Sequence, residues 1–425
     1  MERQRGQVRM ARRRRRRRLA RSAAIGLLAL AAVGGIGLGA LAAGAVTPSG
    51  SPGASVAMIG GGGASPSPSI KPSAVATPTA VPSPTPTPIP TPTPLPTPVL
   101  VPAPLTGRMV SEQVAARHPI AVMVDDQRDA RPQSGFTDAS VVWQAPAEGG
   151  IPRYMLIFQD RVAPSVGPVR SSRLYYIAWA AEWRAVYAHV GGSPQAMQTL
   201  REKGRGQLVY NADEFRWGGI YFHRTRDRFA PHNVYSSGKE LRTLSKRVGA
   251  KDGPLKAAWR FAPDAPLSER PTGGRITVVY SYNKIDYRYD RQTNTYLRAV
   301  TGAAKQIDRG TKLQVAPKNV VVMIMSFAPL NDGSHKHRLE AQFVGKGTAW
   351  IATNGKTIKG TWRKRSITDP TRFYDADGHT VKLTVGQTFI QVMPKGSRIV
   401  IKDGKAAPRP PARIQPLWKM QLTEF

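Results

Sequence analysis

The sequence contains no cysteine, and it also lacks the short motifs of several large enzyme classes. Without cysteine there is no disulfide and no thiolate metal ligand, although this absence does not settle the cellular compartment. No GxGxxG, Walker loop, HExxH or GxSxG is present, so the usual signals of nucleotide binding, zinc proteolysis and serine hydrolysis are missing.

Acidic residues are scarce: 27 Asp and Glu stand against 62 Lys and Arg, which gives a formal net charge of +35. The excess is uneven along the chain. Residues 1–21 hold eleven arginines and one glutamate, residues 22–104 add one lysine, and residues 105–425 carry 50 basic and 26 acidic residues. A folded region this basic attracts polyanions through its long-range field.

The basic head, residues 1–21, precedes an apolar segment, residues 22–46. The head contains seven consecutive arginines, and the segment has twenty-five residues without a charge, which is enough to cross a bilayer. Basic residues before a span stay cytoplasmic, so we expect one transmembrane helix with the folded part outside the cytoplasm. The alternative is secretion after signal-peptide cleavage near Ala45, because Ala43-Gly44-Ala45 fits a cleavage site.

Residues 47–104 are rich in Gly, Ser, Thr and Pro, with Thr-Pro and Ser-Pro repeats in the second half. Such a composition cannot build a core and favours extended polyproline II. We therefore expect a disordered tether that holds the folded part away from the membrane.

The first folded domain is predicted over residues 105–250, with residues 204–235 as a long loop. Ser193 can cap a helix, and Pro194 suits the first helical turn. Strands that alternate with helices predict an α/β sandwich. The predicted strands are 120–124, 139–143, 154–158 and 186–190, and the predicted helices are about 171–183, 194–203 and 237–247.

After a connector, residues 251–275, the hydrophobic period changes to two. Asn354-Gly355 between two apolar runs is a strong hairpin signal. We expect a mostly antiparallel β domain, a barrel or a sandwich, over residues 276–400, followed by a basic tail, residues 401–425; the fold class is α+β overall. Its predicted strands are 276–282, 320–327, 341–344, 348–353, 356–362, 380–385 and 388–393.

Polar residues gather where the strands of the first domain end. Glu148 lies in a turn, Arg153 opens the next strand, and Arg170, Ser171 and Arg173 precede a helix. Guanidinium groups recognise phosphate and carboxylate in a planar, bidentate way, and a helix N-terminus also suits an anion. These residues form a candidate anion clamp. The alternative is that Glu148 pairs with the arginines and only fixes the turn.

His189 ends a predicted strand close to Ser193, so His189 and Glu148 are the candidate acid or base residues. Ser193, His232 and Asn233 join the arginines as candidate ligand-binding residues, although the serine is most simply a helix cap. The histidine spacings are irregular for zinc, so we expect no metal and no cofactor.

Seven motifs follow one another along the chain: E-G-G-I-P-R (148–153), G-P-V-R-S-S-R (167–173), H-V-G-G-S-P (189–194), A-P-H-N (230–233), Y-D-R-Q-T-N-T-Y-L-R (289–298), N-G-K-T-I-K-G-T-W (354–362) and G-Q-T-F-I-Q-V (386–392). Together they resemble the YerB-like lipoprotein family, domain of unknown function 3048. The resemblance implies an N-terminal and a C-terminal part and no assigned activity. Gln144 stands where members usually carry an acidic residue and Pro152 where Thr is common, and without cysteine the usual lipid anchor is impossible.

The leading hypothesis is a membrane-tethered, extracytoplasmic protein that binds an anionic envelope component, such as a wall polymer or a lipid-linked phosphate, in a basic cleft of the first domain. One alternative is an envelope enzyme that acts on a glycan or phosphodiester with Glu148 or His189 as acid or base. Another is a structural or partner-binding protein. An open pocket would favour the first two, and closed ion pairs would favour the third. The outside location argues against a nucleic-acid partner, and the sequence leaves the oligomeric state open.

We predict that a reporter fused after Phe425 is active outside the cytoplasm, because the arginines at 12–18 precede the apolar segment. Activity only inside the cell would contradict this topology. Release of a soluble form cut near Ala45 would instead support the signal-peptide alternative.

Overall fold

The computed structural model describes residues 99–202 and 208–406. The predicted head, the apolar segment, nearly all of the tether and most of the basic tail lie outside these residues. Within the two described ranges, no helix is both long and apolar enough to cross a bilayer. The described residues belong to one compact unit, Thr91–Phe425.

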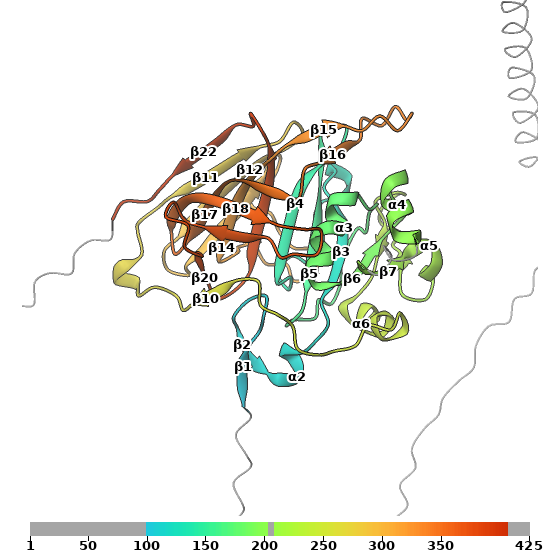
Figure 1. The fold of residues 1–425 in the computed structure, drawn as a ribbon, viewed down its shortest axis with the longest axis horizontal. Helices are drawn as coiled ribbons and strands as arrows, with labels where there is room; N and C mark the ends of the chain where they lie inside the picture. Colours follow the sequence, from blue (N-terminus) through green and yellow to red (C-terminus); the bar gives the residue numbers. More distant parts are fainter. Residues whose placement is uncertain (1–98, 203–207, 407–425) are drawn as a thin grey trace, which may run out of the picture. The chain divides into compact units, whose positions relative to one another are not determined.

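A ten-stranded mixed sheet is the centre of the fold (Figure 1). One half of the sheet comes from the C-terminal segment and the other half from the N-terminal segment. The two halves meet where β21 pairs in parallel with β4, with Ile390 opposite Trp143. In order across the sheet, the strands are β19 (Arg372–Tyr374), β18 (Lys356–Lys364), β17 (Gly345–Thr353), β14 (Asn319–Met325), β21 (Thr388–Pro394), β4 (Val141–Glu148), β5 (Ile151–Phe158), β3 (Ile120–Asp125), β6 (Val186–His189) and β7 (Tyr210–Asp213).

Both faces of this sheet are buried, and strand β3 shows why. Ala121 and Met123 belong to one hydrophobic core, whereas Ile120, Val122 and Val124 belong to a second core on the opposite face. Successive side chains of a strand point to opposite faces, so a strand that is apolar at every position must be covered twice.

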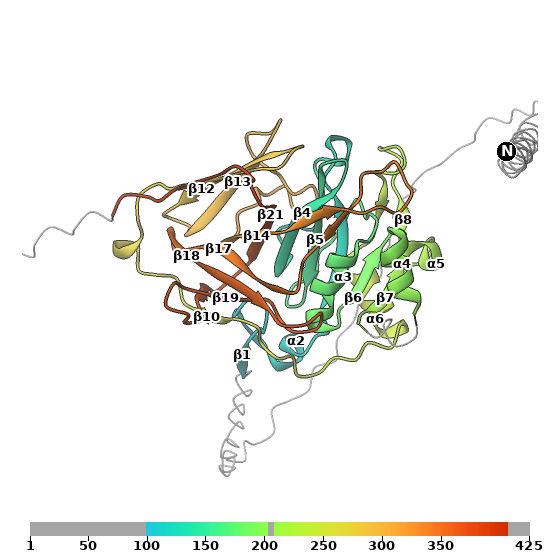
Figure 2. The same ribbon diagram turned by 45° about the horizontal axis from the view of Figure 1, so that its top comes forward.

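A four-stranded antiparallel sheet packs on one face of the large sheet. Its inward residues, among them Ile276 and Val278, share a core with Val320, Val322 and Phe389. Figure 2 shows β12 and β13 alongside β14 and β21. The strands in order are β13 (Thr295–Val300), β12 (Lys284–Asp290), β11 (Arg275–Val279) and β22 (Ile399–Lys402).

Helices cover the sheet near the N-terminal strands. Helix α3 (Leu174–Ala180), continued by η2 (Ala181–Trp183), packs Trp179 against Trp143 of β4, with ring centroids 4.5 Å apart. In helix α4 (Pro194–Arg201) the Ser193 side chain caps the N-terminus, as predicted. Helix α6 (Gly238–Arg247) packs on the opposite face and begins with a capping box between Ser237 and Glu240.

Short elements complete the fold. They are β1 (Leu100–Pro102), β2 (Met109–Ser111), α2 (Glu112–Ala115), η1 (Arg128–Ala130), α5 (Glu214–Trp217), β8 (His223–Arg224), β9 (Val234–Tyr235), β10 (Arg260–Ala262), η3 (Leu267–Glu269), β15 (Phe327–Pro329), β16 (Leu339–Ala341) and β20 (Lys382–Thr384).

Most predicted strands are confirmed, and the hairpin at Asn354-Gly355 joins β17 to β18 with both residues at positive φ. The predicted fold class is confirmed in part. The described residues are mostly β with few helices, and one large sheet runs through both segments. The predicted loop at 204–235 contains β7, α5, β8 and β9, and strands β12, β13 and β22 were not predicted. The two segments do not form separate sheets, because β21 of the C-terminal segment pairs with β4 of the N-terminal segment.

A buried polar network joins the two segments beneath the four-stranded sheet. Arg298 of β13 is fully buried and donates to Gln144 Oε1 at 2.7 Å and to Tyr287 Oη at 2.9 Å. Gln144 in turn donates to Asp126 Oδ2 at 2.7 Å, as does Asn283. Burial raises the pKa of Asp126 to about 6, against the influence of nearby arginines. Gln144 therefore connects a buried cation to a buried acid.

We predict that Gln144→Leu lowers the free energy of unfolding by about 3 kcal/mol, because Arg298 and Asp126 each lose a buried hydrogen bond. Urea unfolding followed by tryptophan fluorescence measures the change, and Gln292→Leu, at an exposed position, is the control.

The shared sheet also leads us to expect one cooperative transition, with Trp143 and Trp362 losing their burial together. Two separate transitions would support residues 105–250 and 276–400 as independent folding units.

Candidate functional site

Three of the predicted clamp residues, Glu148, Arg153 and Arg173, lie together where β4 ends and β5 begins. Arg153 of β5 donates to Glu148 Oε1 at 2.7 Å, and Arg173, the residue before α3, lies 2.6 Å from Glu148 Oε2. Both arginine side chains are buried, whereas that of Glu148 is 26 % exposed. The arginines therefore converge, as predicted, but on the carboxylate of Glu148.

A loop of the C-terminal segment reaches the same carboxylate. Arg338 Nε lies 3.6 Å from Glu148 Oε2, and Arg338 also pairs closely with Asp332 in the loop between β15 and β16. Gly149 donates its backbone N–H to His337. The turn after β4 is thus held from both segments.

The fourth clamp residue, Arg170, belongs to a second cluster. Its Nε lies 2.9 Å from Asp125 Oδ2 at the end of β3, and His232 Nδ1 lies 2.7 Å from the same oxygen. The Asp125 side chain is buried and also accepts a hydrogen bond from the backbone of Gln127. Arg170 and His232 are therefore brought together, again around an acid of the protein itself.

The pKa shifts agree with closed ion pairs. Burial alone would raise the pKa of Glu148, but Arg153 and Arg173 outweigh it and lower the pKa from its ordinary value of 4.5. Burial lowers the pKa of Arg173 to about 10, so this arginine is still charged at neutral pH. An anion would have to displace Glu148 or Asp125 to reach these arginines.

The remaining candidates have structural contacts. His189 is fully buried, and its two ring nitrogens each lie 2.8 Å from a partner, the Gly191 carbonyl and Asn211 Oδ1. A general base at this position would have to give up one of these bonds. Ser193 caps α4, and the Ser171 carbonyl accepts a hydrogen bond from Arg153.

Asn233 accepts a hydrogen bond from Arg224 in the hairpin of β8 and β9, and it donates to the Thr225 carbonyl. Its contacts are those of a residue that fixes a loop. Gln144 lies in the buried network and not at this sheet end.

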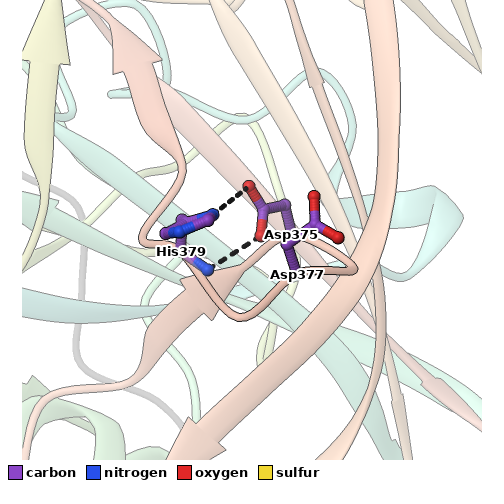
Figure 3. Close-up of side chains that lie close together, drawn as sticks. All are labelled: Asp375, Asp377 and His379. Atoms are coloured by element: carbon purple, nitrogen blue, oxygen red, sulfur yellow. Dashed lines mark hydrogen bonds and ion pairs between the residues drawn. The ribbon is translucent and has the colours of Figure 1, made fainter.

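Among residues 99–202 and 208–406, one group has the geometry of a metal site. Asp375, Asp377 and His379 place their ligand atoms within 4.8 Å of one another in the turn after β19 (Figure 3). Asp375 accepts the backbone N–H of His379 at 2.8 Å, so the turn explains part of the arrangement. Exposed acidic turns of this kind are common without an ion, and the group carries no functional assignment here.

The open basic surface lies elsewhere, on the outward face of the four-stranded sheet. A hollow of about 310 Å³ runs along β11 and β22. All of the charged residues that line the hollow are basic. The charged residues that line it are Arg275, Lys284, Arg398 and Lys402.

The sheet register places these cations in two neighbouring pairs. Arg275 lies opposite Lys402. Lys284 and Arg398 form the second pair, because Val279 lies opposite Lys284 and donates its backbone N–H to the Arg398 carbonyl. Asp286 pairs with Arg275 at 2.8 Å and with Lys284 at 3.4 Å. Arg398 and Lys402 have no acidic partner among the described residues, so their charges are available to a ligand.

Sequence reasoning did not single out this face. A signal is present in the sequence: Arg398, Val400 and Lys402 alternate with Ile399 and Ile401, which places both cations on one face of β22 and the residue before it. The family motifs drew attention to the strand ends of the first segment instead.

We predict that Glu148→Gln lowers the free energy of unfolding by about 2 kcal/mol at neutral pH, because the buried arginines lose their counter-ion. Since the folded-state pKa of Glu148 is lowered, its contribution is present above about pH 4.5 and is lost as the pH falls. Urea unfolding at pH 7 and at about pH 3.5 should show the difference shrinking. Glu269→Gln, at an exposed position, is the control, and an equal loss in both variants would contradict the prediction.

Comparison with known proteins agrees with this architecture. Residues 105–251 match the family model described as "Protein of unknown function (DUF3048) N-terminal domain", and residues 276–390 match the corresponding C-terminal domain. The chain is similar to "Putative lipoprotein YerB" of Bacillus subtilis (strain 168), with 29% identity over 71% of this chain and 88% of the relative. It also resembles the crystal structure of YerB protein from Bacillus subtilis, with a TM-score of 0.62 and 26% identity over 70% of this chain and 99% of that one. With both domain models matched in order, the chain belongs to the DUF3048 family.

Proposed function

We propose that the protein is a membrane-tethered, extracytoplasmic binding protein for an anionic envelope polymer, which it holds in the basic groove of β11 and β22. The observation that carries the proposal is the open hollow lined by four cations, of which Arg398 and Lys402 have no acidic partner among the described residues, whereas Asp286 pairs with the other two. A polymer with repeated anionic groups complements such a surface and gains affinity from several weak contacts.

The tethered location has two supports. The similar protein of Bacillus subtilis is named a putative lipoprotein, and a lipoprotein is held at a membrane surface. This chain has no cysteine to carry a lipid, but its apolar segment, residues 22–46, can serve as the anchor in its place.

The closed ion pairs at the strand ends favour a structural role for the arginine clamp, so the groove replaces it as the expected binding surface. Arg153, Arg170 and Arg173 already have acidic partners, so a ligand gains little net charge interaction there. Nor do the contacts of His189 favour the enzyme alternative, because both of its ring nitrogens are engaged.

The test is binding of long-chain polyphosphate to the full chain in detergent, with all eleven arginines of residues 1–21 replaced by glutamine so that the head does not bind. We expect the affinity to fall as salt rises. Arg398→Gln combined with Lys402→Gln should weaken binding roughly five- to thirtyfold, because each exposed charge contact contributes about 0.5–1 kcal/mol.

The matched control is Lys239→Gln combined with Arg247→Gln on α6, which removes the same charge from exposed positions away from the groove. Equal weakening by both double variants would mean that net charge alone binds the polymer. No binding by the parent chain at low salt would contradict the proposed function itself.

A further inference from the structure

The hollow along β11 and β22 does not end at Arg398. A second hollow of about 370 Å³ begins there, and the two share Val279 and Arg398 in their linings. The second hollow adds Lys395, Ser281 and Ser397, and again no carboxylate lines it. The two hollows are therefore adjoining parts of one basic groove.

The far wall of the second hollow comes from the N-terminal segment. Gly150, in the E-G-G turn between β4 and β5, lines this hollow. Its φ is +75°, and a Cβ at this position would lie 3.0 Å from Ser281 Cβ. A larger residue would therefore be strained and would also crowd Ser281, which lines the same hollow.

The ion pairs of Glu148 hold this wall in place. Glu148 lies two residues before Gly150 and is fixed by Arg153 and Arg173, with Arg338 at longer range. The signature cluster of the first segment thus shapes the groove without contributing its own charges to it. Glu148 is a positioning residue in this arrangement.

The spacing of the cations indicates the form of the ligand. Arg398, the residue before β22, and Lys402, the last residue of β22, are four residues apart in an extended segment, which separates their Cα atoms by roughly 13 Å. When both side chains extend outward from the sheet at this spacing, their charges are too far apart for a single phosphate to contact both, and Lys395 lies further on, in the second hollow. Several anionic groups on one chain could contact all three.

We propose that the two hollows together bind one linear polyanion in an extended form, with its charged groups repeated along both compartments. The proposal rests on the proposed function and adds the ligand class: a flexible chain of phosphodiester or carboxylate units, and not an isolated anion. The hydroxyl groups of Ser281 and Ser397 are available to hydrogen bond the units between the charges.

The experiment compares tripolyphosphate with long-chain polyphosphate, using the full chain with its arginine head replaced. Ser281→Trp places a bulky side chain in the second hollow, and Ser281 is exposed, so the fold should tolerate it. The variant should weaken long-chain binding roughly fivefold or more and leave tripolyphosphate binding unchanged. Ser268→Trp, at an exposed position in η3, is the control. Polygalacturonate in place of polyphosphate distinguishes carboxylate from phosphate repeats.

If Ser281→Trp binds long-chain polyphosphate like the parent while the Arg398 and Lys402 double variant does not, the groove ends at the first hollow. The two-compartment proposal is then wrong, and the proposed function stands. If the parent binds neither probe, the proposed function fails and this inference fails with it. Equal affinity of the parent for both probes would show that a short anion suffices, which overturns the extended-chain proposal.

Discussion

The structure depends on one buried charge, the guanidinium of Arg298. This side chain is fully buried, and three aromatic rings, those of Tyr154, Tyr287 and Phe389, lie within 5.5 Å of it. A charge in such a place must be hydrogen bonded, because its desolvation costs several kcal/mol. Gln144 accepts one of its bonds from the other segment. Side chains from both segments are therefore needed to satisfy the hydrogen bonds of this buried charge.

The large sheet is likewise completed by both segments. Strand β21 pairs with both β14 and β4, so the C-terminal segment contributes the neighbour that β4 needs. The four-stranded sheet, which carries Arg298 on its inner side, is then fixed in orientation over β14 and β21. Its outer side faces away from the core, and the basic groove lies there. The buried charge and the exposed charges are thus on opposite faces of the same small sheet.

Local patterns in the sequence predicted much of this fold. Apolar runs located most strands, Ser193 capped its helix, and Asn354-Gly355 made the hairpin turn. The pairing of β21 with β4 joins residues far apart in the chain, and no local signal specifies it. Two of the three predicted arginines, Arg153 and Arg173, meet at Glu148, whereas Arg170 pairs with Asp125. The further partner Arg338 lies 190 positions from Glu148, so no local pattern could have indicated it. Arg298 did leave a signal, since it alternates in step with the buried residues Tyr296 and Val300.

The same chemistry serves two purposes according to burial. Arg153 and Arg173 are enclosed with Glu148, where a planar guanidinium can satisfy a carboxylate at fixed geometry and hold a turn. Arg398 and Lys402 are exposed and unpaired within the described chain, where a cation attracts a mobile ligand and is screened by salt. A net positive charge read from sequence counts both kinds alike. Only the second kind contributes to an outward field, so the location of unpaired cations, and not their total number, determines where a polyanion is attracted.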